Sequence, residues 1–207
     1  MVATALLSVL SILLEPAFPD AAAQRLAAID EGGAGAAVSA MAFTLAQLPF
    51  VVAVVAIAAM VAPRSPRLAW TGGVFAVLGG FGHAVFGGVA LTQLALADDA
   101  ANRTAMAAVV DRVESGPAVL FMAMGLLGTV LGLLCLSIGQ FRTRVVPRWV
   151  PAALWAFLVV EFVGTGLTEW ATPAAGALYL AALSGTALAL LGRVRVPAAP
   201  RQEVAVA

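Results

Sequence analysis

The chain has 207 residues, of which 62% are hydrophobic and 11% are charged, and its 11 basic residues, all Arg, balance 11 acidic ones. A soluble domain carries about 25% charged residues to cover its core, so this composition excludes an ordinary soluble protein. One His, one Cys and the lack of a basic patch argue against a metal site, a cofactor and a nucleic-acid partner, and we expect none of them.

Apolar runs of about 20 residues form helices in lipid, because the backbone must hydrogen bond to itself there. The sequence predicts membrane spans near residues 2–18, 37–62, 68–96, 117–140, 149–170 and 173–191. We therefore expect an all-α transmembrane bundle of about six spans that forms one domain over residues 1–192. Residues 193–207, rich in Pro and Ala, are expected to form a disordered cytoplasmic tail.

The first apolar run is short, and no basic residue follows Met1. It could be a signal peptide cleaved near residues 21–23, but the missing basic segment argues against that alternative. Thr4, Ser8, Ser11 and Glu15 recur at helical spacing, which predicts a polar stripe on this first helix.

The polar segments between the spans alternate in charge. Segments 63–67, 141–148 and 192–207 contain eight Arg and one acidic residue, whereas segments 19–36 and 97–116 contain three Arg and seven acidic residues. Cytoplasmic loops carry the excess of Arg, so we expect both termini in the cytoplasm. The Arg-only, Ala-rich composition suggests a bacterial source, and we expect a multi-pass protein of the bacterial plasma membrane.

Ionisable groups inside the spans are the features that suggest a site. A charge buried in hydrocarbon costs at least about 2.5–3.5 kcal/mol, so such groups face the protein interior. His83 shares a helix face with Gly80 and Gly87, and Glu161 lies within the fifth span. A rise of about 1.5 Å per residue puts Gln47 about 15 Å, His83 about 20 Å and Glu161 about 13 Å from the outer ends of their spans. The sequence therefore predicts a polar pocket, open to the outside, with these three residues near its floor.

Other residues are expected to complete this pocket. They are Thr44, Thr165, Thr168, Glu15, Glu169 and Trp155. Glu161 and His83 are the candidate catalytic or proton-relay residues, because a His and a Glu buried within membrane spans are typical elements of a proton relay. The competing interpretation is structural: a protonated Glu can hydrogen bond across a helix interface, which contributes about 0.6–2 kcal/mol.

Three short motifs give the chain a resemblance. They are Leu14-Glu15-Pro16, Pro63-Arg64-Ser65-Pro66-Arg67 and Val146-Pro147-Arg148-Trp149. Through these motifs the chain resembles a group of actinobacterial multi-pass membrane proteins with about six helices, which has no established activity. The resemblance implies the helical bundle, and no functional residue is carried over from it.

The sequence is compatible with three functions, and it does not decide whether the protein is an enzyme. The protein could be a non-catalytic accessory protein, or a small proton-linked carrier completed by a homodimer partner. The alternative is a membrane enzyme in which a buried carboxylic acid protonates a lipophilic substrate, as in isoprenoid cyclisation. In each case the expected partners are membrane lipid and a lipophilic small molecule.

Overall fold

The computed structural model describes residues 1–168 and 170–194, and this part of the chain is helical without strands. Its α-helices are α1 (Val2–Leu13), α2 (Ala22–Val61), α3 (Pro66–Ala97), α4 (Arg103–Ser115), α5 (Ala118–Thr143), α6 (Trp149–Phe162) and α7 (Ala171–Val194). Two 3-10 turns, η1 (Ala100–Asn102) and η2 (Gly164–Gly166), precede α4 and follow α6. The predicted all-α bundle is confirmed. Glu169 and the predicted tail from residue 195 onward lie outside the described residues.

Five of these helices, α2, α3, α5, α6 with its following turn, and α7, are long and apolar enough to cross a membrane. The chain is therefore an integral, multi-pass membrane protein. α1 is shorter than the predicted first span: its 12 residues extend about 18 Å, less than a bilayer core requires. It ends at Leu13 because Pro16 and Pro19 prevent the helix from continuing through the rest of the apolar run.

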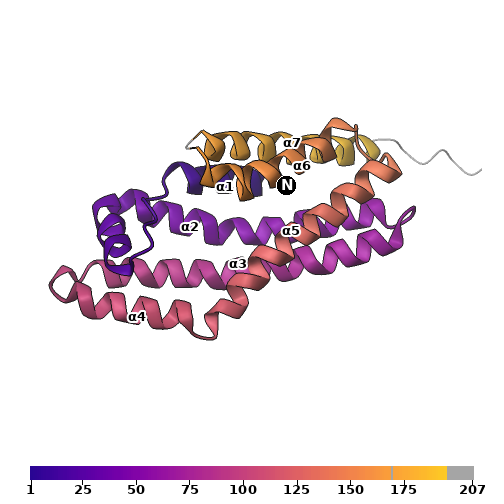
Figure 1. The fold of residues 1–207 in the computed structure, drawn as a ribbon. Helices are drawn as coiled ribbons and strands as arrows, with labels where there is room; N and C mark the ends of the chain where they lie inside the picture. The colour runs from indigo at the N-terminus through magenta and orange to yellow at the C-terminus, as the bar shows by residue number, and fades with distance from the viewer. Residues whose placement is uncertain (169, 195–207) are drawn as a thin grey trace, which may run out of the picture.

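The other helices lie on either side of α2. Figure 1 shows α1, α6 and α7 lying on one side of α2, with α3 and α4 on the other and α5 crossing them. α1 runs beside α2, where the Thr4 hydroxyl donates a hydrogen bond of 2.6 Å to the Ala46 carbonyl. Ser39 on α2 donates to the Ser11 carbonyl in the same way, at 2.8 Å.

The polar segments between the predicted spans are partly helical. α2 begins at Ala22 and α4 occupies 103–115, so both extend into the two acidic segments. α2 continues past a kink at Gly33, whose φ of 49° lies in the region that favours glycine. These parts are too polar to be recognised as membrane spans, which is why the hydropathy pattern missed them.

α3 and α5 pack backbone against backbone. A Cβ atom added to Gly79 would collide with the backbone of Thr129, and one added to Gly82 would collide with the backbone of Gly125. Small residues allow this close approach, which supplies helix association where lipid provides no hydrophobic drive. On another face of α3, Gly80 and Gly87 lie against Phe50 and Thr44 of α2.

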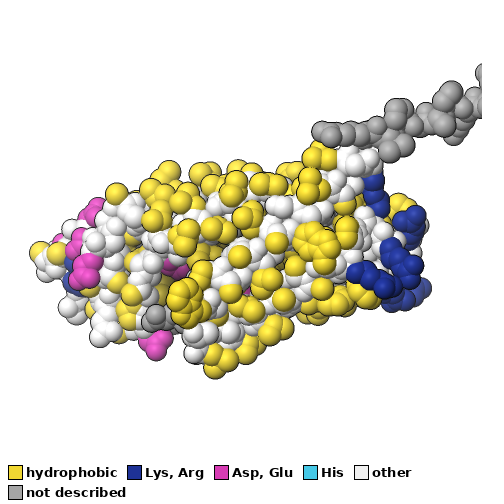
Figure 2. Space-filling view, turned by 90° about the horizontal axis from the view of Figure 1, so that it is seen from above, with side chains coloured by type: hydrophobic (Ala, Val, Ile, Leu, Met, Phe, Trp, Pro, Cys, Tyr) yellow, Lys and Arg dark blue, Asp and Glu magenta, His cyan; other side chains and the backbone are white. Residues whose placement is uncertain are grey.

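The two ends of the bundle differ in charge. Figure 2 shows Arg side chains gathered at one end and Asp and Glu side chains at the other, with hydrophobic side chains between them. We call these the Arg end and the acidic end; by the positive-inside rule the acidic end is expected outside. α2 starts at the acidic end, where Arg25 forms an ion pair of 2.6 Å with Glu114 of α4.

Candidate functional site

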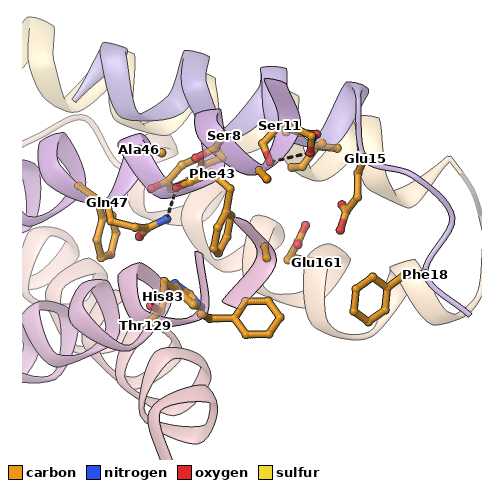
Figure 3. Close-up of a pocket in the computed structure, with 18 of the residues that line it drawn as sticks. Ser8, Ser11, Glu15, Phe18, Phe43, Ala46, Gln47, His83, Thr129 and Glu161 are labelled. Carbon is orange, nitrogen blue, oxygen red and sulfur yellow. Dashed lines mark hydrogen bonds between the residues drawn. The ribbon is translucent and has the colours of Figure 1, made fainter. Parts of the chain in front are cut away.

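A cavity of about 330 Å³ lies inside the bundle, toward the acidic end. Its lining on α2 runs from Ile29 to Phe50, in the middle of that helix, and α1, α3, α5, α6 and α7 complete the walls. This volume is at the lower end of the range of about 300–1,000 Å³ that small-molecule sites occupy. We refer to it as the pocket, and Figure 3 shows the residues that line it.

Two glutamates face each other in the pocket. Glu161 is in the last turn of α6, and Glu15 is in the connection between α1 and α2. In Figure 3 their carboxyl groups point toward one another. The Oε2 atom of Glu161 is buried and has no hydrogen-bond partner within the described part of the chain. Loss of surrounding water raises the pKa of the Glu15 carboxyl above its ordinary value, although part of its side chain stays exposed at the pocket mouth.

The far side of the pocket carries an imidazole, a hydroxyl and an amide group. His83 Nδ1 lies 3.4 Å from the Thr129 hydroxyl, and its ring meets Phe43 edge-on at 5.7 Å. The Gln47 amide donates a 2.8 Å hydrogen bond to the Phe43 carbonyl. Within residues 1–168 and 170–194, neither an ion pair nor a hydrogen bond joins His83 to Glu161. These two residues share the cavity, as do Gln47 and Glu15, but they do not form a direct proton-relay pair.

Apolar and aromatic side chains make up most of the wall. Seven rings line the pocket: Phe18, Phe43, Phe50, Phe86, Phe157, Phe162 and Tyr179. Phe157 of α6 stacks on Tyr179 of α7 with their centroids 4.8 Å apart. None of these rings was predicted as a site residue.

A second, wider hollow continues the pocket toward the acidic end. It shares Glu15, Phe18 and Glu161 with the pocket, and it adds Thr165 and Thr168 after the end of α6. We call it the vestibule. Thr165 and Thr168, which were predicted as pocket residues, therefore line the entrance instead of the pocket itself.

Two predicted pocket residues lie elsewhere. Thr44 donates to the Ala40 carbonyl at 2.8 Å and packs against Gly87 of α3, so it belongs to a helix interface. Trp155 donates a 2.8 Å hydrogen bond to Ser137 on α5 and does not line the cavity. Neither the residue type nor its place in a span determines which way a side chain points. Glu169 lies outside the described residues.

Other polar residues that line the pocket were not predicted as site residues. They are Ser8 and Ser11 on α1, Ser39 on α2, Gln93 on α3 and Thr129 on α5. Ser8 and Ser11 belong to the polar stripe of the first helix, so that pattern was the available signal. Thr129 sits beside Gly128 on the small-residue face of α5, where its hydroxyl was hidden among packing residues.

The pocket has mostly apolar walls, two carboxyl groups and several uncharged hydroxyl and amide groups. Among the described residues, no group of three His, Cys, Asp or Glu side chains is placed to hold a metal ion. Comparisons of the chain with protein-family models, curated proteins and solved structures found no match. The function is therefore inferred from the cavity, its two carboxyl groups and its aromatic walls.

Proposed function

We propose that this protein binds a small lipophilic molecule in the pocket without transforming it, as an accessory protein or carrier of the bacterial plasma membrane. The supporting observation is the cavity of about 330 Å³ with apolar walls and a few converging polar groups. Such cavities are the usual form of small-molecule sites, in which the apolar walls supply affinity and the polar groups supply orientation.

The path to the pocket supports binding from the acidic end. The vestibule opens the pocket on that side through Thr165 and Thr168. Toward the Arg end, buried side chains of the main core fill the bundle, among them Ile57, Leu136 and Leu183. A ligand can thus enter from one side, and transport across the membrane would require the helices to rearrange. Holding a ligand is the simpler function of the two.

An enzyme that protonates a lipophilic substrate is the second candidate. It is favoured by Glu161, which faces the same cavity as aromatic rings able to stabilise a developing positive charge. Trp155, expected to contribute such a face, is engaged with Ser137 outside the cavity. The two candidates differ in outcome, because only the enzyme changes the mass or structure of the molecule that it holds.

The test fills the pocket and asks whether a bound molecule is lost. Ala40 lines the pocket on α2, whereas Ala59 on the same helix is exposed toward lipid. The protein is purified in a non-ionic detergent, and the molecules that stay bound are identified by native mass spectrometry. Wild-type protein and Ala59→Phe should retain a small molecule that Ala40→Phe loses.

Equal retention by all three proteins, or by none, would contradict the proposed binding function. If the wild-type protein is incubated with the molecule that it retains, and a chemically altered product is recovered, that result would instead support the enzyme. Thermal unfolding of each variant in the same detergent shows whether Ala40→Phe stays folded.

A further inference from the structure

We infer that the molecule bound in the pocket carries a positive charge, as a lipophilic amine or quaternary ammonium held between Glu15 and Glu161. This inference deepens the proposed binding function and rests on it. It starts from the position of the two carboxyl groups, which point toward each other where the pocket meets the vestibule. Each hollow is lined by both residues, so a ligand that fills the mouth of the pocket contacts both carboxyl groups.

The described part of the protein supplies no cation to these carboxyl groups. Its two ion pairs are Arg25–Glu114 and Arg103–Asp30, and neither includes Glu15 or Glu161. Arg25 is the basic side chain next to the mouth, since its guanidinium lies 4.6 Å from the centre of the Phe18 ring. Its Nη2 atom is occupied by Glu114 at 2.6 Å. A cation brought by the ligand would therefore fill a role that the protein leaves open.

The walls suit the remainder of such a ligand. Phe18 lines both the pocket and the vestibule, and Phe43, Phe86, Phe157 and Phe162 line the pocket. Aromatic faces attract ammonium groups as well as apolar chains, so they favour a cation with an apolar tail over a hydrated metal ion. Two facing carboxyl groups repel an anion, so fatty acids and anionic lipids are disfavoured. A pure hydrocarbon would fit the walls but would offer the Oε2 atom of Glu161 neither a positive charge nor a hydrogen-bond donor.

Three probes of matched size separate these possibilities: hexyltrimethylammonium, its neutral carbon isostere 2,2-dimethyloctane, and heptanoate. Binding to the full chain in a maltoside detergent is measured by saturation-transfer NMR and by calorimetry. The cation should bind at least about tenfold more tightly than the neutral isostere, and heptanoate should not compete with it. Glu161→Gln and Glu15→Gln should each weaken cation binding at least about tenfold and leave binding of the neutral probe unchanged.

Two controls accompany these variants. Glu161→Asp keeps the charge and should keep most of the cation affinity. Asp98→Asn removes an exposed acidic group at the same end of the molecule, outside the pocket lining, and should have no effect. If Glu161→Gln does not fold, Glu15→Gln provides the same test, because Glu15 lies in a connection and not in a helix.

The outcomes distinguish the two proposals. Equal binding of the cation and its neutral isostere, unaffected by either Gln variant, overturns the cation inference and leaves the pocket as a site for neutral lipophilic molecules. If none of the three probes binds, and Ala40→Phe retains the same molecules as the wild-type protein, the proposed binding function is overturned together with the inference.

Discussion

The carboxyl group of Glu15 faces that of Glu161 across the mouth of the pocket, although the two residues lie far apart in the sequence (Figure 3). α1 and α7 bring them together, since α1 packs against both α2 and α7, and α7 packs against α6. The pocket mouth therefore depends on the packing of the whole bundle.

The close contact of α3 and α5 is expected to be intolerant of any added atom. Gly79→Ala places a Cβ against the backbone of Thr129, so the variant should lose about 1–3 kcal/mol of stability, as overpacked cores do. Gly88→Ala, on the same helix with open space around the new Cβ, is the control and should be neutral. Thermal unfolding in detergent measures both. Equal melting temperatures for the two variants would show that this contact is not tight.

Arg25 and Glu114 should contribute far more to stability than the second ion pair. The Arg25 side chain is 5% exposed, and Glu114 also accepts a hydrogen bond from Gln93 of α3. Arg25→Gln leaves Glu114 in a part-buried site without its partner and should cost about 3–5 kcal/mol. Arg103→Gln breaks the more exposed pair with Asp30 and should cost less than about 1 kcal/mol. Denaturant unfolding of the single variants decides this, and similar losses would contradict it.

Gly33 and Gly35 offer a matched test of backbone conformation. Neither has an atom within 4 Å of an added Cβ, so side-chain space does not distinguish them. Gly33 alone has a positive φ, of 49°. Gly33→Ala should therefore destabilise the start of α2 by about 1–3 kcal/mol. Gly35→Ala should instead be neutral or slightly stabilising, because Ala favours a helix. Proteolysis at the acidic end should increase only for Gly33→Ala. Equal cleavage of the two variants would show that the backbone at Gly33 does not require glycine.

The orientation of the bundle can be tested by cysteine labelling. Cys135 is the one natural cysteine, so a Cys135→Ser background removes unwanted labelling. In intact cells, a membrane-impermeant maleimide should label Asp98→Cys at the acidic end. Ser65→Cys, between α2 and α3 at the Arg end, should be labelled only after permeabilisation. The reverse pattern would show that the acidic end faces the cytoplasm.

Hydropathy was sufficient to predict the apolar helices, because lipid requires long apolar runs to be helical. It failed at α4, whose polar sequence carries no such signal, and it overestimated α1, which ends before two prolines. The depth of Gln47, His83 and Glu161 along their helices was enough to predict that they line one cavity. It did not give their levels within that cavity: all three were expected near its floor, whereas Glu161 lies at the mouth, where the pocket meets the vestibule. Trp155 and Thr44 lie within predicted spans but point into helix interfaces. The rotation of a helix about its axis decides which way its side chains point, and this rotation depends on neighbouring helices that the sequence alone does not place.

The glycine contact between α3 and α5 also limits how the pocket can open. Backbones in direct contact have no layer of side chains that could slide or rearrange, so the wall made by these two helices should be rigid. α1 is tied to α2 by hydrogen bonds from Thr4 and Ser39. α6 and α7 are held to α5 in turn, by the hydrogen bonds from Trp155 to Ser137 and from Gln140 to Thr186. The expected route of ligand exchange is therefore the vestibule, which already opens the pocket beside Glu15 and Glu161.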